Sequence, residues 1–112
     1  MKPTMKRPLT LPLFVLLLVC SHLATALDLA FKQVAPGIYA SIGELGLRTY
    51  ENEGMNGNVG FIVTDAGVVV VDSGSSYQVA RKIHTAIRQV TQQPVKFVIN
   101  TGGKDHRWLG NG

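Results

Sequence analysis

The residues best suited to chemistry lie near the end of the sequence, where Asp105 and His106 stand side by side in a glycine-rich segment. This segment follows an apolar run, Val95 to Ile99, that is typical of a β-strand. Loops at the carboxyl ends of strands present functional side chains in many α/β folds. Because carboxylate and imidazole groups both suit zinc, the pair is a candidate metal site. Its spacing is equally typical of an ordinary polar turn.

A complete catalytic zinc site usually has three protein ligands and one water molecule. After residue 26, His84 is the only other histidine, and it falls in a predicted helix beside the apolar stripe. That position is more typical of a residue at the border of a buried face than of a ligand. The single cysteine, Cys20, lies in a segment that is expected to be removed. The sequence therefore predicts a metal site that is incomplete on its own.

Asp72 ends an apolar run and precedes a turn, Ser73 to Ser76. Two interpretations of its carboxylate are open. In the first, it lies beneath the metal site and orients a ligand through a hydrogen bond. In the second, it caps the turn by accepting from nearby backbone amides. One side chain can do both.

Other catalytic and nucleotide-binding motifs do not match. Gly102-Gly103-Lys104 lacks the spacing of a phosphate-binding loop and the Ser or Thr that follows its lysine. Ser73-Gly74-Ser75 lacks the flanking glycines of a nucleophilic serine in α/β hydrolases. Nucleophilic serine chemistry is therefore not expected.

The first 26 residues have the pattern of a secretory signal peptide. Basic residues come first, an apolar core runs from Leu11 to Cys20, and Ala24 to Ala26 supplies the small residues of a cleavage site. We expect cleavage after Ala26 and a periplasmic or secreted product. An uncleaved anchor is an alternative, although the apolar run is short for a membrane span. Lipidation of Cys20 is another alternative, and no stable membrane anchor is expected.

Removal of the leader leaves 86 residues, with eight Lys or Arg against seven Asp or Glu. The net charge of +4 in the whole chain thus belongs largely to the leader. No basic stripe remains for nucleic acid, so a nucleic-acid partner is excluded. Residues 27–112 are enough for one small domain with a marginal core.

The mature chain predicts strands first and then a strand–helix–strand unit. A polar loop, residues 43–58, is expected to be either functional or mobile. The strand Val68–Asp72 is apolar at every position before Asp72, which predicts burial on both faces, and Val95–Ile99 is expected to be the next buried strand. These two strands should pair in parallel through a right-handed crossover. The predicted elements are strands Phe31–Val34, Ile38–Ser41, Val59–Val63, Val68–Asp72 and Val95–Ile99, with a hairpin loop at 64–67 and a helix, Tyr77–Thr91, whose apolar stripe is Val79, Ile83, Ala86, Ile87 and Val90.

Several of these segments, in order, resemble the amino-terminal third of metallo-β-lactamase-fold hydrolases: Gly37-Ile-Tyr39, Gly57 to Val63, Val69 to Gly74, Pro94 to Thr101 and Leu109-Gly-Asn111. The closest likeness is to the secreted quinoprotein relay system zinc metallohydrolases. The resemblance implies an α/β (α+β) fold, namely the incomplete amino-terminal half of an αββα sandwich. It also implies a zinc cofactor and a small-molecule substrate of unknown identity.

The metal motif departs from the family pattern, Thr-His-x-His-x-Asp-His. Counted from Thr101, Gly102 and Lys104 stand where the first two histidines would be. A shift of one residue aligns Asp105 and His106 with the Asp-His pair. The resemblance thus implies Asp105 and His106 as metal ligands, and the family's remaining ligands fall beyond residue 112.

Two kinds of function remain open. The first is the amino-terminal fragment of a periplasmic metal-dependent hydrolase, linked through the subfamily to quinoprotein alcohol oxidation and not expected to be active alone. The second is a non-catalytic secreted binding or assembly module, or a truncated product. Half of a sandwich exposes a sheet face that should be core, so self-association or a protein partner is expected there.

Overall fold

The computed structural model describes Met1 and residues 27–112. Apart from Met1, the predicted signal peptide lies outside the described residues. Within the described part of the chain, no helix is both long and apolar enough to cross a membrane. The elements of regular structure described below all lie within residues 27–112.

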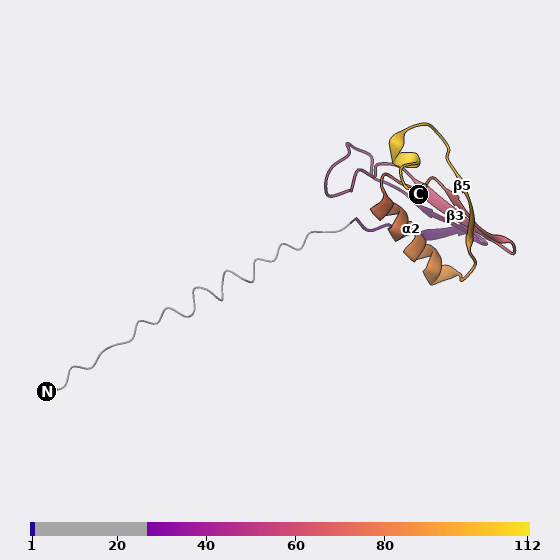
Figure 1. The fold of residues 1–112 in the computed structure, drawn as a ribbon, viewed down its shortest axis with the longest axis horizontal. Coiled ribbons are helices and arrows are strands. Elements are labelled where there is room, and N and C mark those ends of the chain that lie inside the picture. The colour runs from indigo at the N-terminus through magenta and orange to yellow at the C-terminus, as the bar shows by residue number, and fades with distance from the viewer. Residues whose placement is uncertain (2–26) are drawn as a thin grey trace.

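Five strands form one mixed sheet, and helix α2 packs against it (Figure 1). Strands β1 to β4 form an antiparallel meander, and β5 lies parallel to β4 at the edge of the sheet. Helix α2 connects β4 to β5, which confirms the predicted strand–helix–strand unit and the α+β class. The elements are β1 Lys32–Ala35, β2 Ile38–Ser41, β3 Val59–Thr64, β4 Gly67–Val71, α2 Tyr77–Val90, β5 Val95–Ile99 and a 3₁₀ turn, η1, Asp105–Arg107.

The predicted boundaries are nearly those of the structure. Strands β2 and β5 match the prediction, and the other predicted elements differ by one residue at one or both ends. The hairpin loop is shorter than the predicted 64–67, because Thr64 pairs with Gly67. Gly67 has a φ of 135°, and a Cβ atom there would lie 2.5 Å from Lys96 Cγ and 2.8 Å from the Pro94 carbonyl oxygen. Glycine suits this position because it readily adopts a positive φ and has no side chain to collide with these atoms.

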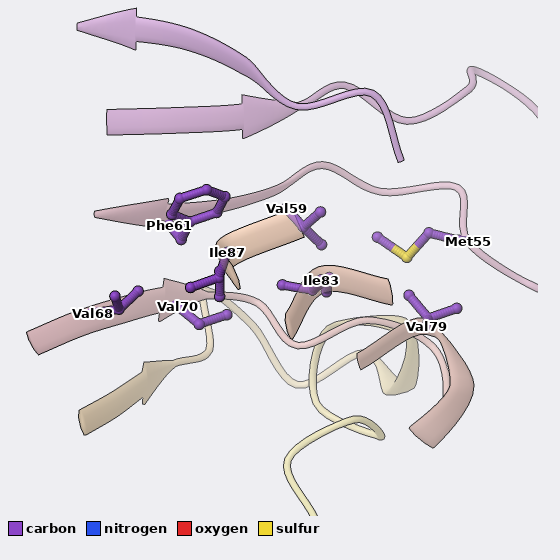
Figure 2. Close-up of a cluster of buried hydrophobic side chains, with 8 residues drawn as sticks. All are labelled: Met55, Val59, Phe61, Val68, Val70, Val79, Ile83 and Ile87. Atoms are coloured by element: carbon purple, nitrogen blue, oxygen red, sulfur yellow. The ribbon is translucent and has the colours of Figure 1, made fainter. Parts of the chain in front are cut away.

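The hydrophobic core lies between α2 and one face of the sheet (Figure 2). Its centre is Phe61, which is fully buried, with ring centroids 5.1 Å from Phe31 and 4.8 Å from Tyr39. Aromatic packing at these separations adds to the free energy gained by burial. The buried apolar residues are Met55, Val59, Phe61, Val68, Val70, Val79, Ile83 and Ile87.

Helix α2 places most of its predicted stripe on the sheet. Val79, Ile83 and Ile87 are buried, as expected from their spacing. Val90 is 42% exposed, so the prediction of burial was wrong for this last residue of the helix. The helix begins with a capped turn, because the Ser76 hydroxyl accepts from the Val79 N–H at 3.2 Å.

The face of the sheet that lies away from α2 is apolar and largely uncovered. In β4, Val68 and Val70 are buried under the helix, whereas the alternate residues are only half-buried. The prediction that β5 is a buried strand was wrong: Phe97 is 67% exposed and Ile99 54% exposed. The reason is that β5 is an outer strand, and no described residues form a layer over this side. Strand register places six apolar residues here, which we call the open face: Ile38, Ile62, Val69, Val71, Phe97 and Ile99.

Candidate metal site

Asp72 connects the carboxyl ends of β4 and β5. Its carboxylate is buried and accepts from the Thr101 N–H at 2.8 Å and from the Thr101 hydroxyl at 2.6 Å. The Arg107 guanidinium lies 3.4 Å from the same carboxylate. Asp72 thus holds the loop that follows β5, in part by accepting a hydrogen bond from a backbone N–H of that loop. The backbone of Asp72 has a φ of 60°, a left-handed conformation that Asp and Asn tolerate better than most residues.

The loop after β5 is held against the end of β4 by a second set of hydrogen bonds. The Ser73 N–H donates to the Arg107 carbonyl at 2.8 Å, and the Ser73 hydroxyl donates to Asn111 Oδ1 at 2.6 Å. Asn111 Nδ2 donates in turn to Asn100 Oδ1 at 2.8 Å. These contacts fix both ends of the loop that carries Asp105 and His106. The sequence pointed to Asn111 only as part of Leu109-Gly-Asn111, one of the segments that carry the family resemblance.

Asp105 and His106 begin the 3₁₀ turn η1 and meet Arg48, which lies 57 and 58 positions earlier in the chain. Arg48 Nη1 donates to Asp105 Oδ2 at 2.9 Å, and Nη2 donates to Asp105 Oδ1. The same Nη2 lies 2.6 Å from His106 Nδ1. Sequence analysis missed Arg48, because a single arginine in a polar loop has no pattern that links it to a distant carboxylate.

The charges of this cluster are well defined at neutral pH. The Arg48 guanidinium beside Asp105 lowers the pKa of that carboxyl to about 2. Burial lowers the pKa of His106, and the neighbouring cations Arg48 and Arg107 lower it further. Asp105 is therefore a carboxylate and His106 a neutral imidazole. Since Nδ1 of His106 faces a guanidinium donor, we assign the ring proton to Nε2.

Folding lowers the pKa of Asp105, which fixes the pH dependence of its pairing. The contribution of the Arg48–Asp105 pair to the stability of the fold is fully present above the pKa that the carboxyl group has in the unfolded chain. It is lost as the pH falls towards the native pKa of about 2. The Arg48–Asp105 contact therefore persists throughout the neutral and mildly acidic range.

The polar loop of residues 43–58 is well anchored on one side, and this anchoring positions Arg48. Asn52 is buried; its Oδ1 accepts from the Thr49 N–H at 2.9 Å, and its Nδ2 donates to the Leu47 carbonyl at 3.0 Å. Lys82 of α2 pairs with Glu53 at 2.5 Å. Of the two predicted alternatives for this loop, a functional role fits better, because its bonds support a residue of the candidate site.

His106 packs closely on the end of the same loop. A Cβ atom on Gly57 would lie 3.0 Å from His106 Cδ2 and 3.5 Å from Nε2. The buried imidazole therefore packs closely on the backbone of residue 57, and a side chain there would crowd it.

Gly57→Ala is expected to displace His106 and to weaken its contact with Arg48. The crowding at 3.0 Å should lower the free energy of unfolding by about 1–2 kcal/mol. Urea denaturation and the histidine side-chain NMR signals of the full chain would measure both effects. Gly103→Ala is the matched control, because a Cβ atom there meets nothing within 4 Å. Equal stability and an unchanged His106 signal in both variants would contradict the prediction.

The structure brings together only part of the donor set that zinc requires. Among residues 27–112, no three His, Cys, Asp or Glu side chains meet in a way that could hold a metal ion. His84 is exposed on α2 and lines a hollow of about 300 Å³ beside β5. Its location agrees with the interpretation as a helix residue.

Asp105 and His106 nevertheless suit one ion as two of its ligands. Asp105 Oδ1 and His106 Nδ1 lie 3.8 Å apart. Two ligands of a tetrahedral zinc ion, each about 2.0–2.2 Å from the metal, are about 3.4 Å apart. A small adjustment of either side chain would bring both donors to one ion, so the residues present fit a metal that takes its other ligands elsewhere.

Residues 52–103 match the family model of the Metallo-beta-lactamase superfamily. The match is slightly less than half of the chain and contains β3, β4, α2, β5 and Asp72. It begins after Arg48 and ends before Asp105. No curated protein matches the chain. Together with the match, the mixed sheet and its helix are consistent with a partial metallo-β-lactamase fold, and proteins of that superfamily generally use zinc.

Proposed function

We propose that this chain is the amino-terminal part of an exported metallo-β-lactamase-fold hydrolase that acts on a small-molecule substrate. The observation that carries the proposal is that a carboxylate, Asp105, and a neutral imidazole, His106, lie together at the carboxyl end of the sheet. Both donors lie in a loop that Asp72 attaches to β4. The match to the superfamily gives this arrangement its chemical context.

Each residue has a distinct role in the proposed site. Asp105 offers carboxylate oxygens, and His106 offers the lone pair of Nδ1. Asp72 would position these donors through its contacts with Thr101 and Arg107. Zinc, when bound, polarises a carbonyl or ester group and lowers the pKa of a water molecule.

The open face supports the proposal that further ligands come from a second sheet. Phe97 and Ile99 are more than half exposed, and apolar side chains of this size favour burial. In an αββα sandwich, a second sheet with its helices would cover this face. The leader predicted for residues 1–26 and the likeness to quinoprotein relay metallohydrolases extend the proposal to an exported enzyme of quinoprotein-dependent alcohol oxidation.

A second candidate function is a non-catalytic exported module. The specific observation in its favour is that Arg48 already satisfies both oxygens of Asp105 and approaches Nδ1 of His106. Such a module would use the open face to pair with a second copy of the chain or with another protein.

Zinc uptake separates the two functions. The full chain is expected to bind one zinc ion weakly in a calorimetric titration, because it supplies only two ligands, and Asp105→Asn and His106→Ala should each abolish this binding. His84→Ala is the matched control, since it removes an exposed histidine outside the proposed site. No zinc binding, or equal binding by all variants, would contradict the metal site and favour the non-catalytic module.

A further inference from the structure

We infer that Arg48 and the metal ion compete for the same two donors, so that metal enters this site only when the guanidinium leaves it. The inference rests on the proposed metal site of Asp105 and His106. It adds a residue, Arg48, that neither the sequence pattern nor the matched segment, 52–103, includes.

The competition follows from the position of a single nitrogen atom. Arg48 Nη2 is within hydrogen-bond distance of both Asp105 Oδ1 and His106 Nδ1. These two acceptors are 3.8 Å apart, and an ion that bound both would occupy the space between them. Nη2 lies in that space. Two cations cannot share it, because they would repel each other at short range and need the same lone pairs.

Every donor atom of Asp105, and Nδ1 of His106, is engaged by Arg48. Both Asp105 oxygens accept from the guanidinium, and His106 Nδ1 faces Nη2. A metal ion that bound either residue beside Arg48 would have to share these atoms with a cation at short range.

The side chain of Arg48 is suited to leaving the site. It is 38% exposed, and residues 44–50 around it are all exposed. Asn52 holds the backbone on either side of it, through the Leu47 carbonyl and the Thr49 N–H. Release would therefore require rotation of the Arg48 side chain, while the loop backbone and the core under α2 stay in place.

Zinc affinity of the full chain, measured by isothermal titration calorimetry, tests the inference. Arg48→Ala is expected to bind zinc roughly five- to tenfold more tightly than the unchanged chain, because a two-pronged, charge-assisted contact no longer opposes binding. The zinc affinity of Arg48→Lys should lie between those of Arg48→Ala and the unchanged chain. Arg81→Ala, the matched loss of one exposed arginine from α2, should leave the affinity unchanged. Circular dichroism would verify that each variant is folded.

Trypsin provides a second readout, because it cleaves after arginine. Zinc is expected to speed cleavage after Arg48 in the unchanged chain, since the ion would displace the guanidinium into solvent. Equal or weaker zinc affinity in Arg48→Ala, or protection of this bond by zinc, would overturn the competition but keep the metal site. Absence of zinc binding in every variant would overturn the proposed metal site and the competition together.

Discussion

Asp72→Ala is expected to lower the free energy of unfolding of the full chain by about 3 kcal/mol, from the loss of a buried, hydrogen-bonded carboxylate. The Thr101 amide and hydroxyl would lose their acceptor, and the Arg107 guanidinium would lose its charged partner. Alanine would also have to adopt a φ of 60°, which it does at a cost. Urea denaturation would measure the change.

Asp72→Asn separates these contributions. Asparagine tolerates the left-handed backbone and still accepts one hydrogen bond, so this variant should lose less stability than Asp72→Ala. Thr101→Val should reproduce part of the loss, because it removes the hydroxyl that donates to Asp72 at 2.6 Å. If Asp72→Ala proved as stable as Glu44→Ala, an exposed carboxylate control, Asp72 would not be holding the loop.

Phe61→Ala is expected to lower the free energy of unfolding by about 4 kcal/mol, or to prevent folding altogether. Phe61 is fully buried and packs against Phe31 and Tyr39, so truncation would leave a cavity in the core. Phe61→Leu should be milder, because leucine refills much of the space. Thermal and urea unfolding of these variants would provide the measurement.

Phe97→Ala is the matched control, since it makes the same change on the open face. At 67% exposure, Phe97 loses little packing when truncated, and the expected loss of stability is below about 1 kcal/mol. A loss as large as that of Phe61→Ala would mean that the open face is buried in solution. Similar small losses at both positions would falsify the assignment of Phe61 to the core.

The elements could be predicted because their signals are local. Helix α2 follows from the spacing of Val79, Ile83 and Ile87, and from the hydroxyl of Ser76 just before it. The parallel pairing of β4 and β5 follows from the helix between them. Each inference needs only the few residues on either side.

The candidate site could be predicted only in part, because its contacts span the chain. Asp72, Asp105 and His106 attracted attention through their residue types and their places next to apolar runs. Arg48 did not, because its partner lies 57 positions away and the intervening chain must fold before they meet. The buried position of His106 also depends on Gly57, which gave no chemical signal.

The environment of β5 was mispredicted for a different reason. Val95 to Ile99 is mostly apolar, and such a run indicates a buried strand. The composition of a strand does not show whether another layer of the protein covers its second face. In the described residues α2 covers one side only, so Phe97 and Ile99 remain exposed.

The edge position of β5 also bears on unwanted assembly. An outer strand offers unpaired backbone groups to which another chain can add a strand, and apolar side chains make such addition more favourable. In Val95–Ile99 the only charged side chain is Lys96. A charge on an edge strand opposes strand addition, because the growing stack would have to bring like charges together. We therefore expect Lys96, which also lies against Gly67 in the hairpin, to oppose fibrous aggregation at this edge.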